Sequence, residues 1–307
     1  IRIEDREAWT GMMARILERC ADPGSGAGRS ACFMAVARLS DASRAGWPVR
    51  DQWKTYTESL LDGAKPLDAS SQMGLYRAVL ARLEIGGAAK STMTELRNIL
   101  LARLTELYLA LPDPRHDPQV TWLVDQYRSA GRIDRAYEIA ARIHNPALKQ
   151  WKKIELLGHE RKYAEMAEAC EELEQSDNTE YASRALRKRA ELYNNQLGRH
   201  KDAINLYRLI NEPPATAWAI VDCYVRMGQP EDAVRELTEI ESFFEREAPR
   251  AALRKAQIWA KSGNRKQAVA ECRRILKKYP RHQVSSTCHQ MLERFGVATG
   301  GGVIDVE

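Results

Sequence analysis

One combination of residues recurs through the second half of this chain of 307 residues. An aromatic residue is followed by Gly, then by Ala, and in several units by Pro. The units are Tyr127, Gly131, Ala136 and Pro146; Trp151, Tyr163 and Ala167; Tyr193, Gly198, Ala203 and Pro213; Tyr224, Gly228 and Ala233; and Trp259, Gly263, Ala268 and Pro280. Successive alanines are 31, 36, 30 and 35 residues apart. A period of this length is typical of a stacked array of helical repeats.

Each residue type in the unit has a physical reason to recur. Helical periodicity predicts helices over 251–261 and 265–278, with Gly263 in the tight turn between them, since Gly tolerates positive φ. Ala268 is small where the two helices cross, and a larger side chain there would cost roughly 1–3 kcal/mol. Pro280 ends the second helix. The sequence therefore predicts pairs of antiparallel helices.

These residues resemble the tetratricopeptide-repeat signature, most closely between Ala252 and Pro280, and the resemblance extends over about residues 118–282. It implies an all-α fold, a right-handed α-solenoid of antiparallel helix pairs. Asn194 in a widened turn and the lack of Pro after Phe244 depart from the pattern and affect the register of the repeats. We predict a solenoid over 116–282 with about five repeats, a capping helix over 283–295 and a Gly-rich tail over 296–307.

Residues 1–115 lack the signature but still have a helical pattern. Helices are expected over 2–19, 31–45, 50–61, 71–83 and 92–111, separated by segments rich in Gly and Pro. The segment 112–118 holds three prolines and is the clearest joint in the chain, so we predict a boundary there. The alternative is that 1–115 continues the solenoid as divergent helix pairs.

Composition excludes several classes of protein. The chain has 47 basic and 42 acidic residues, a net charge of +5, without the concentrated basic stripe of a nucleic-acid-binding protein. No run of about 18 apolar residues suggests a membrane helix. The six cysteines form no C-x-x-C pair, and reduced thiols in a cytoplasmic protein are expected, with a periplasmic protein that has lost its signal peptide as the alternative.

No motif predicts catalysis, a cofactor or a metal. The segment 24–30 resembles a phosphate-binding loop, but Pro23 replaces the first Gly and Arg29 replaces the Lys. His282, Cys288 and His289 are too few and too widely spaced for zinc. No nucleophile has a recognisable local signature. We therefore expect a protein that is not an enzyme.

The predicted binding surface follows from the resemblance. In tetratricopeptide arrays, first-helix residues line a concave groove that often binds extended peptides. The residues that this pattern places in the groove are Lys149, Lys152, Lys153, Arg184, Arg187, Lys188, Asn194, Asn195, Trp218, Asp222, Arg226 and Arg254. Cations that share one groove favour an acidic segment or a C-terminal carboxylate. The family's carboxylate clamp is not reproduced, because Glu191 stands where an Asn is expected.

The main functional hypothesis is thus a scaffold or adaptor that binds a protein or peptide, and the cations of the groove predict that this partner is acidic. Two alternatives remain. Residues 120–136 also resemble a pentatricopeptide repeat, which would bind RNA, although the uneven spacing would not keep register with bases. The chain could also be an accessory subunit of a larger enzyme or envelope assembly, contacted through 1–115. We expect the acidic tail 303–307 to dock either on this chain or on a second copy. Docking on a second copy would give a homo-oligomer.

Overall fold

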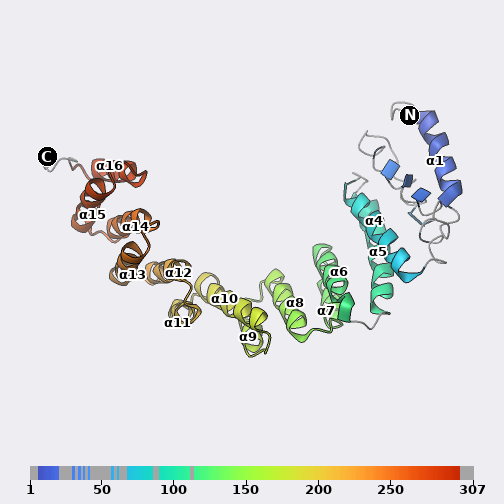
Figure 1. Ribbon diagram of the computed structural model, residues 1–307, viewed down its shortest axis with the longest axis horizontal. Coiled ribbons are helices and arrows are strands. Elements are labelled where there is room, and N and C mark those ends of the chain that lie inside the picture. The colour runs from blue at the N-terminus through green and yellow to red at the C-terminus, as the bar shows by residue number, and fades with distance from the viewer. Residues whose placement is uncertain are drawn as a thin grey trace. The chain divides into compact units, whose positions relative to one another are not determined.

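The computed structural model describes residues 6–20, 68–85, 90–110 and 114–297, together with ten single residues between 30 and 61. The described residues are almost entirely helical (Figure 1). The chain forms two compact units, Ile1–Lys152 and Lys153–Glu307, which divide within the helix α8 (Pro146–His159). The all-α fold of consecutively packed helix pairs is confirmed.

The first unit holds helices that the sequence predicts only in outline. The predicted helices over 2–19, 71–83 and 92–111 correspond to observed helices shifted by a few residues at their ends. Of those predicted over 31–45 and 50–61, single residues are described, in helical conformation. The helices are α1 (Arg6–Cys20), α4 (Ala69–Ile85), α5 (Lys90–Leu109), the short 3-10 helix η1 (Pro114–His116), α6 (Asp117–Ser129) and α7 (Ile133–Ala140).

Helix α6 packs directly against α5. Tyr127 of α6 is buried, and its hydroxyl lies 3.2 Å from the hydroxyl of Thr105 on α5. Arg97 of α5 donates a hydrogen bond to Gln126 of α6 at 2.9 Å. Packing therefore runs across the predicted joint at 112–118, as it would if 1–115 continued the array. The boundary at residue 115 stays a prediction.

The second unit begins within α8 and continues as alternating first and second helices of each pair. Each helix from α10 onward packs against the one that precedes it, up to α16. The turns between them are short because each pair folds back at a Gly or an equivalent residue. The helices are α9 (Tyr163–Glu174), α10 (Thr179–Asn195), α11 (His200–Ile210), α12 (Ala215–Arg226), α13 (Pro230–Phe243), α14 (Ala248–Lys261), α15 (Arg265–Lys278) and α16 (Val284–Arg294).

The recurring Gly and Ala have the roles that the sequence predicts. The four glycines between paired helices have φ between 65° and 80°, which an L residue adopts only at a cost. The five recurring alanines are at most 5% exposed, so a larger side chain would have no room between the crossing helices. The glycines are Gly131, Gly198, Gly228 and Gly263, and the alanines are Ala136, Ala167, Ala203, Ala233 and Ala268.

Two features depart from the predicted pattern. In the weak second unit Arg161 occupies the turn where the other units have Gly, with φ of 59°. Pro146 follows the second helix of its pair, as predicted, but it stands well after the end of α7 at Ala140 and begins α8. A proline suits the first position of a helix, since that N–H would have no partner within the helix.

Helix α16 covers the apolar end of the array. Val284, Cys288 and Leu292 lie on one face of α16 and are buried against Ala252 and Ile275 of the preceding pair. The opposite face is polar and exposed at Ser286, His289 and Glu293. This is the pattern of a helix that closes a repeat array. The predicted docking of the tail 303–307, and the loop at 24–29, lie outside the described residues.

Candidate partner-binding surface

The first helices of the second unit are joined by polar contacts between equivalent positions. Arg226 on α12 donates hydrogen bonds to the backbone oxygen of Asn194 at 3.3 Å and to Asn195 Oδ1 at 3.1 Å, both on α10. Arg254 on α14 lies 3.5 Å from Asp222 on α12. These partners are separated by 31 or 32 residues, close to one repeat. Five of the predicted binding residues therefore take part in contacts between neighbouring repeats.

Helix α10 carries the densest group of exposed cations on this surface. The side chains of Arg184, Arg187 and Lys188 are 43%, 45% and 39% exposed. Positions three and four apart lie on one face of a helix, so the three cations share a face. We call Arg184, Arg187 and Lys188 the α10 cation group.

Each cation of this group has an acidic neighbour that is itself exposed. Arg187 forms an ion pair with Glu212, and this contact raises the pKa of Arg187. The nearest carboxylates to the other two are Glu180, at 4.0 Å from Arg184, and Glu191, at 3.6 Å from Lys188. The three acidic side chains are 55% to 77% exposed. Exposed ion pairs contribute only about 0–1 kcal/mol each, so a partner's carboxylate can replace them.

Trp218 lies in a small cluster on α12. Its indole Nε1 donates a hydrogen bond to Glu247 at 3.1 Å. The guanidinium of Arg250 lies 4.5 Å from the centroid of the ring and is also 3.4 Å from Glu247. A guanidinium over an aromatic face is stabilised by the ring's quadrupole. The ring is thus covered on one side and only partly available to a partner.

Two predicted residues are not available on this surface. Asn194 is 5% exposed, and its Oδ1 lies 3.1 Å from His200 Nδ1. Lys152 is 7% exposed, and its ammonium lies 3.1 Å from both carboxylate oxygens of Asp125. A buried polar group requires such partners, so both side chains stabilise the fold. The expectation that they face a partner is corrected by their burial.

Lys149 and Lys153 also lie on α8, one helical turn apart. Within the described residues, neither side chain forms an ion pair. Lys153 is exposed and Lys149 is half-buried. Together with Arg226, they are the predicted cations that form no ion pair in the part of the chain that the structure describes.

The acidic neighbours of the α10 cation group were not predicted from the sequence. Glu212 lies in the turn after α11, and Glu180 and Glu191 flank the cations on α10 itself. Alignment of the units would have shown that Asp222 and Arg254 occupy neighbouring positions one repeat apart. Glu212 could not be found in this way, because the turn that carries it has a different length in each unit.

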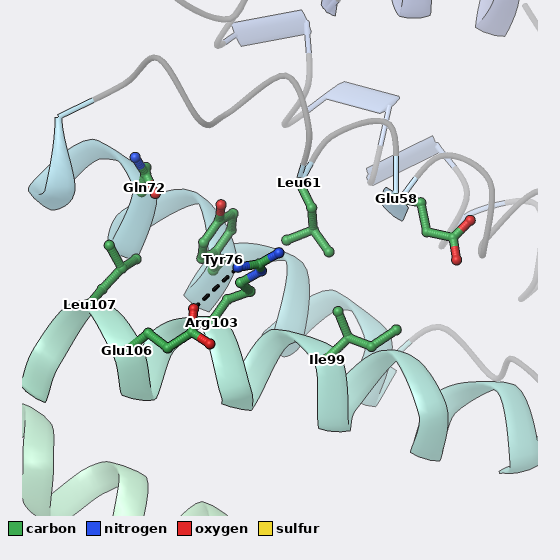
Figure 2. A pocket seen from close by; sticks show the side chains of 8 residues that line it. All are labelled: Glu58, Leu61, Gln72, Tyr76, Ile99, Arg103, Glu106 and Leu107. Carbon is green, nitrogen blue, oxygen red and sulfur yellow. Dashed lines mark hydrogen bonds and ion pairs between the residues drawn. The ribbon is translucent and has the colours of Figure 1, made fainter.

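A hollow of about 400 Å³ in the first unit was considered as a second site (Figure 2). It lies between α4 and α5, with Tyr76 and Leu61 buried in its wall. Arg103 and Glu106 are paired with each other at 3.2 Å along one edge. The described residues that line it include no Cys, His or Ser.

Two further surveys cover the described residues. None of their helices is long and apolar enough to cross a membrane. Within the same ranges, no group of three or more His, Cys, Asp or Glu side chains is arranged to hold a metal ion.

Comparison with known families identifies one repeat directly. The family model described as "Tetratricopeptide repeat" matches residues 250–282, which are the pair α14 and α15 with the turn that follows. This helix pair therefore matches a tetratricopeptide repeat. The matched segment is the one in which the sequence resemblance was strongest. A tetratricopeptide repeat is typically a non-catalytic scaffold that binds proteins or peptides.

Comparison with solved structures gives 24 similar chains. One of them, described as "Crystal Structure of P58(IPK) TPR Domain at 2.5 A", is 11% identical, with 92% of this chain and 99% of that chain covered and a TM-score of 0.25. No curated protein matches the chain.

Proposed function

We propose that this tetratricopeptide-repeat protein binds an acidic segment of a partner protein along the first helices of its second unit. The α10 cation group is the main contact. Arg226 and Arg254 extend the same surface onto α12 and α14. The function is binding rather than catalysis.

The observation that carries the proposal is the exposure of three cations on one face of α10. Each forms an ion pair with an exposed carboxylate of this chain, and Arg184 also lies 5.4 Å from the centroid of the Tyr181 ring. A partner that brings several carboxylates at once can exchange with all three, because the individual pairs are weak. Arginine also binds carboxylates in a bidentate geometry, which adds direction to the attraction.

The contacts between repeats support the proposal in a second way. Arg226 is fixed by Asn195 and by the backbone of α10, so its guanidinium is already oriented before a partner arrives. Arg254 is oriented by Asp222 in the same manner. Side chains that are ordered in advance lose less conformational entropy on binding. The surface is therefore prepared for an extended ligand that passes from one repeat to the next.

The test uses a fluorescein-labelled peptide of alternating Glu and Ser with a free C-terminal carboxylate. Fluorescence anisotropy with the wild-type chain is expected to show saturable binding that weakens as salt is raised. Changing Arg184, Arg187 and Lys188 together to Ala is expected to weaken binding at least tenfold. The same peptide with Lys in place of Glu is expected not to bind this surface.

A matched control removes three exposed cations from second helices instead. Lys201, Arg235 and Lys266 lie on α11, α13 and α15, and their combined change to Ala alters the net charge by the same amount. This variant is expected to bind the Glu peptide as the wild type does. Equal losses in both variants would show that net charge, and not the α10 surface, attracts the peptide, and would reject the proposal.

A further inference from the structure

A cavity of about 620 Å³ lies in the second unit between α11, α12 and α13. Tyr207, Ile220 and Ile240 form a buried apolar part of its lining. Its size is in the range of pockets that enclose a large side chain or a small ligand. None of the predicted binding residues lines it.

An aromatic ring at this cavity is unusually exposed. Phe243 lines the cavity and is 78% exposed, at the last turn of α13. Leu209 on α11 is 69% exposed. They are the two large hydrophobic side chains that are exposed among the described residues of the second unit. Of these two, only Phe243 lines the cavity, and an exposed aromatic ring at the mouth of an apolar cavity is a contact point that a partner can cover.

The cavity lining holds two carboxylates, Glu236 and Glu239, and one cation, Arg208, so one negative charge is left over. Glu236 is half-buried, and its single ion pair is with Arg208 at 3.5 Å. The same Arg208 guanidinium nitrogen also donates to Tyr224 at 3.2 Å. Glu239, one turn further along α13, lies on the cavity without an ion pair in the described residues. Burial raises the pKa of Glu236, and repulsion from Glu239 raises it further.

We propose that this cavity binds a segment of a partner protein in which a large apolar side chain stands next to Arg or Lys. The apolar side chain enters between Tyr207, Ile220 and Ile240 and is covered by Phe243. The cation meets the carboxylates of Glu236 and Glu239. Charge complementarity selects this occupant, because a partly desolvated carboxylate beside a second one is stabilised most by a cation.

This site is separate from the α10 surface in both chemistry and position. Its lining comes from α11, α12 and α13, and its charge is opposite to that of the α10 cation group. A protein with both surfaces can hold a basic–apolar segment and an acidic segment at once. The two sites can therefore be tested independently of each other.

The test uses the NMR signals of isoleucine methyl groups to find where a synthetic peptide binds. The probe is a synthetic peptide with a central Leu flanked on both sides by Arg. Methyl spectra of the full chain are expected to shift at Ile220 and Ile240, which line the cavity, and not at Ile258 and Ile275, which are buried in α14 and α15. Peptides with Ser in place of Leu, or Glu in place of Arg, are expected to bind at least tenfold more weakly.

Variants then assign the contacts. Affinity for the Arg–Leu peptide is expected to fall at least tenfold in Phe243→Ala. The same loss is expected in the double variant Glu236→Gln with Glu239→Gln, in which the affinity should also no longer depend on salt. The matched control, Glu168→Gln with Glu231→Gln, removes two exposed carboxylates that do not line the cavity and is expected to change nothing.

The circular dichroism spectrum of each variant confirms that it is folded. The α10 variant is expected to bind the Arg–Leu peptide normally. Lack of saturable binding would overturn the proposal, and so would shifts at Ile258 and Ile275 in place of Ile220 and Ile240. The proposal would also be overturned if the folded Phe243 and Glu236/Glu239 variants bound the Arg–Leu peptide as tightly as the wild type does.

Discussion

The ammonium of Lys255 lies 2.7 Å from a carboxylate oxygen of Glu241, and both side chains are only 6% exposed. Glu241 comes from α13 and Lys255 from α14, so the pair joins two successive repeats. Arg274 of α15 binds the same carboxylate through two nitrogens, at 2.7 and 2.8 Å, and Lys278 lies 3.0 Å away. One acidic side chain thus contacts three cations of the last repeat, and Glu271 forms further ion pairs with Lys255 and Arg274.

Glu241→Gln is expected to destabilise the second unit by about 3 kcal/mol. Removing one partner of a buried ion pair leaves the other charges without compensation, which typically costs about 3–5 kcal/mol. Urea unfolding followed by circular dichroism measures the change. Glu239→Gln, which removes an exposed carboxylate two residues earlier, should alter stability by less than about 0.5 kcal/mol. A loss below about 1 kcal/mol for Glu241→Gln would contradict the role of this carboxylate.

The same carboxylate gives stability a defined pH dependence. Burial alone would raise the pKa of Glu241, but hydrogen bonds from Arg274, Lys255 and Lys278 outweigh it and hold the pKa well below the ordinary 4.5. Its stabilising contribution is therefore complete above pH 4.5 and is lost as the pH falls through the lower folded-state pKa. The difference in the free energy of unfolding between wild type and Glu241→Gln should therefore narrow as the pH falls below 4.5.

Glu236 provides a control of opposite sign. Because its pKa is raised in the folded chain, its carboxylate is destabilising at neutral pH and this effect disappears on acidification. Glu236→Gln should therefore be at least as stable as the wild type at neutral pH and should lose that advantage as the pH falls. If the changes in unfolding free energy of the Glu241 and Glu236 variants varied with pH in the same direction, the opposite pKa shifts assigned to the two carboxyl groups would both be contradicted.

Arg161→Gly is expected to stabilise the chain. Arg161 has φ of 59°, and a left-handed conformation costs an L residue roughly 1–2 kcal/mol. Glycine avoids that strain but gains more freedom in the unfolded chain, so the net gain should be about 0.5–1 kcal/mol. Thermal unfolding measures it. Gly263→Ala should have the reverse effect through conformation alone, since φ there is 80° and no atom lies within 4 Å of the added Cβ. Destabilisation by Arg161→Gly would show that its side chain contributes more than this strain.

The buried thiols of Cys170 and Cys223 should be almost inert in the folded protein. Burial raises the pKa of Cys170 to about 12, with a further contribution from Glu174, and raises that of Cys223 to about 11, with a contribution from Asp222. The reactive thiolate is therefore scarce at pH values near 8. Iodoacetamide labelling followed by peptide mapping should be at least about 100-fold slower at these two positions than in urea-unfolded chain. Rapid labelling of folded chain would mean that these helices open readily.

The repeating part of the fold could be predicted because its signals are local. Gly263 must turn and Ala268 must be small whatever the partner of the repeat is, and the structure has both residues in those roles. Arg161 could not be predicted in the same way. A positive φ at an arginine follows from the path of the helices on either side, and not from the preference of the residue itself.

The candidate surface was predictable by position but not by partner. Arg187 and Arg254 lie on first helices as expected, yet each is next to a carboxylate of another element, Glu212 or Asp222. Such pairs depend on which turns of two helices meet, and one sequence does not state this. Phe243 was noted only because no Pro follows it. Its exposure beside a cavity depends on three helices together.

The central claim is that the exposed face of α10 recruits an acidic protein, and affinity capture from native extract tests it most directly. The baits are the wild-type chain and the triple variant in which Arg184, Arg187 and Lys188 are changed to Ala. Recovered proteins are identified by mass spectrometry. The account predicts a protein that the wild type recovers and the folded variant loses, and that an acidic peptide from its own sequence displaces. Equal recovery by both baits, or enrichment of RNA without a specific protein, would contradict it.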